Sequence, residues 1–118
     1  MDAARKKELK ESYREIQTWY GVIKLTNQHN GKVFIDSFSN IKNKEYYLRS
    51  QLDEGRHPNA ALQADWKIYG GEAFAYEVLE QKDAAKVTDV TWETKQLEKR
   101  FLIELEPYGD AGYNKLPR

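Results

Sequence analysis

The chain has 118 residues, of which 40% are hydrophobic, and its 19 basic and 19 acidic side chains cancel to a formal net charge of zero. This length predicts one domain, and its aromatic residues (3 Trp, 8 Tyr and 4 Phe) supply enough large apolar surface to exclude intrinsic disorder. The absence of cysteine excludes disulfides, thiolate zinc sites and thiol nucleophiles, and two histidines, His29 and His57, are too few for a multi-histidine metal cage.

The first predicted element is an amphipathic helix over residues 2–18, in an N-terminal segment (residues 1–19) that precedes a single domain at residues 20–118. The helical part has no Gly or Pro and is rich in Glu, Lys and Ala, which favour a helix. Its apolar side chains recur every three or four residues and form one stripe, which consists of Leu9, Tyr13, Ile16 and Tyr20. We expect this helix either to cap the domain or to contact a second copy of the chain or another protein.

Two extended segments follow and predict an antiparallel hairpin. The runs at residues 20–26 and 32–38 are rich in aromatic and β-branched residues, which favour strands. Between them lies Asn30-Gly31, a pair that is typical of hairpin turns because both residues tolerate positive φ. Since side chains alternate along a strand, Tyr20 is expected on the face opposite to that of Ile23.

Two helices are expected after the hairpin. Asn40 stands where an N-cap would, and Gly55 supplies a left-handed stop, so the first helix lies between them. Its two tyrosines, Tyr46 and Tyr47, are typical of packing residues. The second helix opens at residues 57–59, where a proline is tolerated in the first turn, and is expected to bury Leu62, Trp66 and Tyr69.

The remaining pattern predicts a third strand at residues 73–80, a long helix at about residues 91–105 and a loop from residue 106 onward. Apolar residues at steps of four mark the buried side of the long helix, which is formed by Leu97, Phe101 and Leu105. The order of elements is helix, strand, strand, helix, helix, strand, helix. We therefore expect an α/β fold in which helices flank a small three-stranded antiparallel sheet.

Charge and hydropathy limit the partners. No apolar run approaches the roughly 20 residues that span a bilayer, and the N-terminus lacks the apolar stretch of a secretory signal. We therefore expect a cytoplasmic protein without a membrane partner. Residues 21–58 carry six basic side chains against four acidic ones, whereas residues 59–80 carry one against four. This distribution permits a basic face for nucleic acid and does not require one.

Several sequence blocks resemble, in order and spacing, the GIY-YIG nuclease family. They are GVIKLTN and NGKVFIDS in the hairpin, then NIK, EGRHPNAALQADWKIYG and FAYEVLE, and finally Leu97-Glu98 and Gly112-Tyr113-Asn114. The likeness covers about residues 20–114. It implies the family's small three-stranded antiparallel sheet, and it implies cleavage of DNA with one divalent ion, Mg²⁺ or Mn²⁺.

The resemblance assigns roles to four residues that are present in this chain. It places the metal-binding glutamate at Glu98 and the asparagine that helps to position the phosphate at Asn114. The phosphate-steadying arginine falls on Lys44, whose ammonium cannot hold two oxygens as a guanidinium does, and the family's histidine falls on His57. Each also has a structural interpretation: Glu98 as an ordinary helical glutamate, Asn114 as a turn residue, Lys44 as a solvated residue and His57 as a helix cap.

The two tyrosines that name the family are replaced, which makes this a degenerate version of the motif. Ile23 stands at the first position and has no group that orients water or accepts a proton, while Phe34 at the second keeps the ring without the hydroxyl. The glycine two residues later is Asp36, which shares a strand face with Phe34. Asp36 either adds a second metal ligand beside Glu98 or repels a phosphodiester, and repulsion is favoured.

Three functions are consistent with these residues. The first is metal-dependent cleavage of DNA. This cleavage would be slow because both tyrosine hydroxyls are lost, and general acid–base groups contribute roughly 10²–10⁴ in rate. The second is binding of nucleic acid, or regulation of a process, without cleavage. The third is a protein-interaction module that uses the N-terminal helix and the tyrosines near residue 46. Loss of efficient catalysis is favoured over its retention.

Overall fold

The computed structural model describes residues 17–116. The predicted N-terminal helix at residues 2–18 and its apolar stripe, apart from Tyr20, therefore lie outside the described residues. The described elements follow the predicted order of two strands, two helices, a strand and a helix. They are β1 (Trp19–Asn27), β2 (Val33–Phe38), α2 (Lys44–Asp53), α3 (Ala60–Tyr69), β3 (Phe74–Asp83) and α4 (Val90–Leu105), with 3₁₀ turns at Gly71–Ala73, Ala84–Lys86 and Gly109–Ala111.

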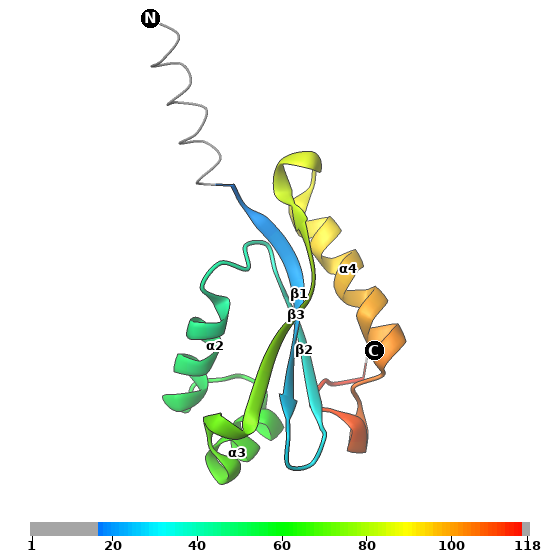
Figure 1. Ribbon diagram of the computed structural model, residues 1–118. Coiled ribbons are helices and arrows are strands. Elements are labelled where there is room, and N and C mark those ends of the chain that lie inside the picture. Colours follow the sequence, from blue (N-terminus) through cyan, green and yellow to red (C-terminus); the bar gives the residue numbers. More distant parts are fainter. Residues whose placement is uncertain (1–16, 117–118) are drawn as a thin grey trace, which may run out of the picture.

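The strands form the predicted antiparallel sheet in the order β2-β1-β3, so that β1 is central and β2 is an edge strand. Helices α2 and α3 cover one face of the sheet and α4 covers the other (Figure 1). Strand β3 extends three residues beyond the predicted end at residue 80, because its last residues still pair with the start of β1. The predicted α/β fold class is confirmed.

The β1–β2 hairpin is present, but its turn is longer than the Asn30-Gly31 pair suggests. The amide of Asn27 donates to the carbonyl oxygen of Lys32 at 2.9 Å, so four residues lie between the paired ends. Gly31 alone of the Asn30-Gly31 pair has a positive φ, at 77°. Asn30 instead accepts a hydrogen bond from the amide of Lys32 through its side chain, which is a local turn that asparagine forms readily.

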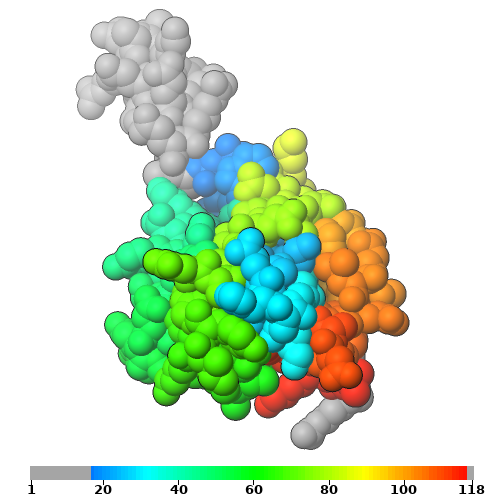
Figure 2. Space-filling view, turned by 60° about the horizontal axis from the view of Figure 1, so that its bottom comes forward, coloured from blue at the N-terminus to red at the C-terminus, as the bar shows by residue number. Residues whose placement is uncertain are grey.

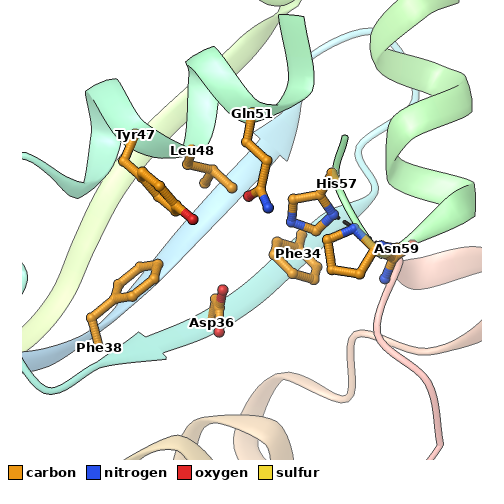
Figure 3. A pocket seen from close by; sticks show the side chains of 9 residues that line it. Phe34, Asp36, Phe38, Tyr47, Leu48, Gln51, His57 and Asn59 are labelled. Carbon is orange, nitrogen blue, oxygen red and sulfur yellow. Dashed lines mark hydrogen bonds between the residues drawn. The ribbon is translucent and has the colours of Figure 1, made fainter. Parts of the chain in front are cut away.

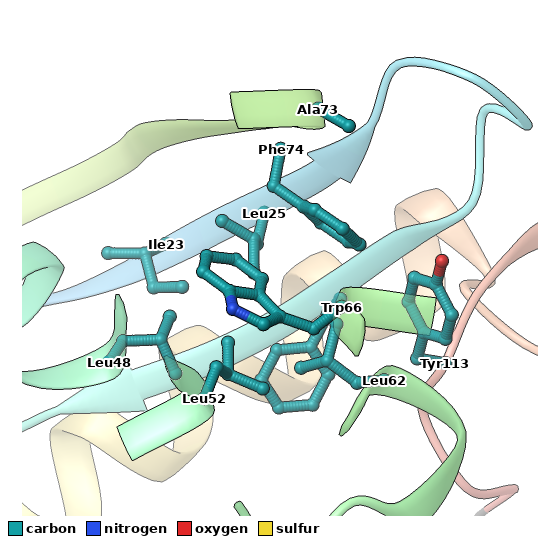
Figure 4. Close-up of a cluster of buried hydrophobic side chains, with 10 residues drawn as sticks. Ile23, Leu25, Leu48, Leu52, Leu62, Trp66, Ala73, Phe74 and Tyr113 are labelled. Atoms are coloured by element: carbon teal, nitrogen blue, oxygen red, sulfur yellow. The ribbon is translucent and has the colours of Figure 1, made fainter. Parts of the chain in front are cut away.

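Side-chain alternation along β1 separates two buried clusters. Ile23 and Leu25 face α2 and α3, where they pack against the apolar residues of those helices (Figure 4). Tyr20 and Val22 face the other way and pack with Leu97 of α4. Tyr20 is therefore buried on the face opposite to Ile23, as predicted, and its hydroxyl is remote from the α2 side of the sheet.

Two predicted core positions are wrong. Tyr69 at the end of α3 is 40% exposed and stacks on the ring of His29 at a centroid distance of 5.2 Å. Leu105 at the end of α4 is also 40% exposed, because the buried side of this helix passes through Phe101 and Leu102 instead. Both errors fall on the last turn of a helix, where the chain leaves the sheet.

The starts of α2 and α3 also differ from the prediction. Asn40 does not cap α2: its side chain accepts from the amide of Lys42, and the helix begins at Lys44 after Asn43, which has a left-handed conformation with φ of 62°. The N-cap of α3 is Asn59, whose side chain accepts from the amide of Leu62 at 3.1 Å. The helix therefore begins after residues 57–59 and not within them.

The tail predicted as a loop lies along the edge of the sheet. Gly112 forms a parallel bridge with Val33 of β2, and the amide of Tyr113 donates to the carbonyl oxygen of Val33 at 2.9 Å. Figure 2 looks onto this end of the molecule, where the hairpin turn (cyan) lies between α3 (green) and the C-terminal segment (red). Within residues 17–116, none of the helices has the length and hydropathy needed to cross a membrane.

Candidate functional site

A pocket of about 320 Å³ lies between β2, α2 and the segment that precedes α3. The side chains that line it come from all three, and Figure 3 shows them around a common opening. They are Phe34, Asp36 and Phe38 from β2, Tyr47, Leu48 and Gln51 from α2, and His57, Pro58 and Asn59 from the connecting segment. Residues at alternate positions of a strand share one face, which explains why β2 contributes every second side chain.

Asp36 is the acidic group of the pocket. The pKa of its carboxyl is raised from 3.8 to about 6, chiefly by burial and to a smaller extent by the negative charge of Glu98. Two interactions oppose this rise: the amide of Ser37 donates to Oδ1 at 2.8 Å, and the positive charge of Lys95 lies nearby. A carboxyl with this pKa is still largely ionised at neutral pH, so its charge is only partly compensated by the protein.

Glu98 lies on α4, the helix that covers the opposite face of the sheet (Figure 1). Its side chain is 20% exposed and pairs with Lys95 at 3.8 Å. Its negative charge contributes to the raised pKa of Asp36, less than burial does. Within residues 17–116 no group of three or more acidic or histidine side chains is placed to hold a metal ion.

Two carboxylates are nevertheless a donor set that suits Mg²⁺ or Mn²⁺. These are hard cations that take oxygen ligands, and Mg²⁺ is commonly held by one or two carboxylates with the remaining positions filled by water. The pKa of Asp36 is raised chiefly because burial disfavours its charged form, and a cation beside the carboxylate would favour that form again. The oxygen donors of Asp36 and Glu98 thus have the chemistry that suits a divalent ion.

His57 presents a neutral imidazole to the pocket. The amide of Asn59 donates to its Nδ1 at 3.0 Å, so in the neutral ring the proton is on Nε2. Burial lowers the pKa of His57, which favours this neutral form. Nε2 faces the pocket on the side of Gln51 (Figure 3). His57 is thus positioned as a hydrogen-bond donor, and it is Asn59, not His57, that caps α3.

The positions of the family's two tyrosines are apolar and buried. Ile23 has no exposed surface and lies in the cluster beneath α2. Phe34 is 7% exposed and meets the ring of His57 edge-on, with centroids 5.3 Å apart. Neither strand position therefore brings a hydroxyl to the pocket.

Lys44 lies at the rim of the pocket, at the start of α2. Its ammonium is 5.6 Å from the ring centroid of Phe38 and 5.4 Å from that of Tyr47. Cations at such distances are attracted to the negative face of aromatic rings. Lys44 also lines the neighbouring hollow between α2 and β3, so its charge lies between the two depressions.

Asn114 lies beside the pocket and is bound to the main chain of β2. Its Oδ1 accepts from the amide of Ile35 at 2.9 Å, and its Nδ2 donates to the carbonyl oxygen of Ile35 at 2.8 Å. This pair of bonds copies the pairing of a neighbouring strand and occupies the edge of β2 next to Asp36. The side chain thus fixes the part of β2 that carries the acidic group.

The structure therefore gathers most of the residues predicted from the sequence around β2. Phe34, Asp36 and His57 share the pocket, Lys44 is at its rim and Glu98 interacts with Asp36, while Ile23 is buried below it. Sequence reasoning missed Gln51 of α2, and it considered Tyr47 as a replacement hydroxyl but favoured a packing role for it. Tyr47 and Gln51 are four residues apart, a spacing that places them on one helix face, and this was the available signal.

The expectation that both tyrosines of α2 are packing residues is also wrong. Tyr46 is 78% exposed and Tyr47 is 56% exposed, so neither is part of a buried cluster. The apolar face of α2 is formed by Leu48 and Leu52, which point into the core. The two tyrosines flank this face, with Tyr47 on the side of the pocket and Tyr46 on the side of β3.

No family model and no curated protein sequence matches the chain. Solved structures do match. The catalytic domain of the homing endonuclease I-TevI has a TM-score of 0.67 at 22% identity, over 83% of this chain and 99% of that chain. A point mutant of the catalytic domain of the intron endonuclease I-TevI gives the same TM-score and identity over 81% and 92%. I-TevI is a GIY-YIG nuclease, so the fold predicted from the sequence blocks is confirmed.

Proposed function

Because the chain has the fold of a GIY-YIG nuclease catalytic domain, we propose that it is a nucleic-acid-associated domain that cleaves phosphodiester bonds slowly in the presence of Mg²⁺ or Mn²⁺. The observation that carries the proposal is the pocket of this fold that brings Asp36 and His57 together. The pKa of Asp36 is raised there, chiefly by burial and in part by the charge of Glu98 on α4. Such perturbed groups are concentrated at functional sites.

The substrate contacts follow from the donors that face the pocket. The Nε2–H group of His57 is available to a non-bridging phosphoryl oxygen, and Lys44 supplies a positive charge at the rim. Asn114 acts through the main chain of Ile35, since its carboxamide holds the strand that carries Asp36. A bound divalent ion would add Lewis-acid stabilisation of the charge on the phosphoryl group.

The low rate is expected because the strands supply no hydroxyl. Hydrolysis adds one water to phosphorus and breaks one P–O ester bond, and the leaving oxygen gains a proton. Ile23 and Phe34 contribute no group to these proton transfers. General acid–base groups contribute roughly 10²–10⁴ in rate. We propose that cleavage is slower by a factor in this range than in proteins of the same fold that keep both hydroxyls.

Cleavage of supercoiled plasmid and of fluorescein-labelled single-stranded DNA with Mg²⁺ or Mn²⁺ tests the proposal. We expect slow nicking that EDTA stops and that Glu98→Gln abolishes. Glu104→Gln is the matched control, because Glu104 lies on the same helix with an exposed side chain near Arg100. Cleavage that survives in Glu98→Gln would come from a contaminant or another site and would contradict the proposal.

A second candidate is binding of nucleic acid without cleavage, and the burial of Ile23 and Phe34 favours it. A domain that has lost these hydroxyls retains the pocket, His57 and Lys44 as phosphate contacts. It would bind DNA with an affinity that falls as the salt concentration rises, and it would not cleave the DNA with either Mg²⁺ or Mn²⁺. The protein-interaction role of the N-terminal helix and the cytoplasmic location stay predictions.

A further inference from the structure

Tyr47 brings a hydroxyl to the pocket from α2. It lines the pocket together with Asp36 and His57, and its hydroxyl points toward the middle of the opening (Figure 3). The residue is 56% exposed, so a ligand reaches it without displacing the core. Phe34 does not supply a hydroxyl here, because its ring meets that of His57 edge-on and carries no polar atom.

The ring of Tyr47 has a defined position. The ammonium of Lys44 lies 5.4 Å from its centroid and 5.6 Å from that of Phe38, so one cation bridges the two rings. Phe38 belongs to β2 and Tyr47 to α2, and both line the pocket. Lys44 therefore ties the helix to the strand at the rim and holds the tyrosine over the pocket.

Resting on the proposed function, we infer that the hydroxyl of Tyr47 hydrogen-bonds the phosphodiester group in the pocket and takes the place of the hydroxyls that Ile23 and Phe34 lack. The phenolic O–H donates to a non-bridging phosphoryl oxygen, next to the donor on His57. No covalent bond forms or breaks on the tyrosine, and its proton stays in place. The hydrogen-bond donors to the phosphodiester thus lie on α2 and on the segment before α3, and none of them lies on β1.

Tyr76 is the rival for this role and lies in the wrong place. Its side chain lines the neighbouring hollow between α2 and β3, together with Tyr46 and Lys44, and not the pocket that contains His57. Burial and the charges of Glu45 and Asp36 raise its pKa to about 12.

Tyr47→Phe and Tyr46→Phe form a matched pair, because each removes one exposed hydroxyl from adjacent positions of α2 and only one of them lies in the pocket. Circular dichroism and urea unfolding confirm that both variants fold. The first readout is the affinity for fluorescein-labelled single-stranded DNA at low salt in EDTA, measured by anisotropy. The second is kcat/KM for cleavage of the same DNA with Mn²⁺.

We expect Tyr47→Phe to lower affinity or kcat/KM by about ten-fold or more, as for the loss of a hydrogen bond to a charged oxygen. Tyr46→Phe should stay within about two-fold of the wild type, as for a surface substitution. If the wild type cleaves DNA and the two variants behave alike, the role of Tyr47 is wrong and the proposed function stands. If the wild type binds DNA without cleaving it, the proposed cleavage is wrong and the affinities of the two variants alone test Tyr47. If the wild type does neither, both are wrong.

Discussion

Replacing Asp36 by asparagine should make the protein more stable at pH 8 and leave its stability nearly unchanged at pH 3.5. The carboxyl has an ordinary pKa of 3.8 in the unfolded chain and a pKa of about 6 in the folded protein, chiefly because folding buries it. The folded protein thus binds the proton more readily than the unfolded chain between these pH values. Stability is lost as pH rises through this window, and the loss is complete above about pH 6.

The magnitude follows from the difference between the two pKa values. Each pKa unit corresponds to about 1.4 kcal/mol, so ionised Asp36 costs about 3 kcal/mol at pH 8. The asparagine keeps an oxygen that accepts from the amide of Ser37, although its own amide group must be partly desolvated. We therefore expect Asp36→Asn to raise the free energy of unfolding by about 1–3 kcal/mol at pH 8.

Urea unfolding followed by tryptophan fluorescence measures this change at both pH values in metal-free buffer. Asp110→Asn is the control, because Asp110 is an exposed aspartate in the turn Gly109–Ala111 and its replacement should change stability by less than about 0.5 kcal/mol. A loss of stability in Asp36→Asn at pH 8, or an equal change at pH 8 and pH 3.5, would refute the reasoning. Either result would mean that the Asp36 carboxylate is well compensated by the folded protein.

Mg²⁺ or Mn²⁺ at ten times its dissociation constant should stabilise the wild type by about 1.4 kcal/mol at pH 8, and Glu98→Gln should lose most of this gain, as measured by urea unfolding. An unchanged metal response in the variant would exclude Glu98 as a ligand. Gly112→Ala should destabilise the protein by about 2–4 kcal/mol, because a Cβ would overlap two backbone carbonyl oxygens. A smaller loss of stability in thermal unfolding would mean that the C-terminal segment shifts away from β2 at little cost. Asn114→Ala should cost about 1–3 kcal/mol and should speed hydrogen exchange at the amide of Ile35, which loses its acceptor; unchanged exchange there would contradict the described bonding.

Much of the fold was predictable because its signals are local. Strand alternation in the hairpin placed Tyr20 and Ile23 on opposite faces, and the spacing of Leu62 and Trp66 on α3 identified two buried residues. These patterns reflect the period of a helix or a strand, which the sequence carries directly. The order of elements followed from them.

The errors occur where a residue has two comparable local partners. Asn40 satisfies the amide of Lys42 instead of capping α2, and the turn then continues to Asn43 in a left-handed conformation. Asparagine forms such turns as readily as helix caps, so the sequence does not decide between them. Tyr69 fits the helical period of α3, but it meets His29 at the surface, a contact that depends on where the hairpin turn lies.

The resemblance singled out Asp36 and His57 from the sequence, and these two residues line one pocket. What it did not provide is the set of contacts that α2 makes with β2. The resemblance gave Lys44 a phosphate contact and its residue type favoured a solvated position, but neither indicated that its ammonium lies near the rings of Phe38 and Tyr47. That arrangement depends on how the helix packs on the sheet, and no local pattern contains it. The importance of Tyr47 follows only from this packing.

The charge of the pocket bears on both proposed functions. An ionised carboxylate at Asp36, beside Glu98, destabilises the folded protein at neutral pH and repels a phosphodiester as well. A divalent ion would remove both penalties at once, because it neutralises the carboxylates and attracts the phosphate. Without an ion, the donors on His57 and Tyr47 would have to overcome the repulsion alone. Glycine or asparagine at position 36 would not repel the phosphodiester of a bound nucleic acid. The aspartate is therefore easier to explain in a site that binds a cation than in one that only binds nucleic acid.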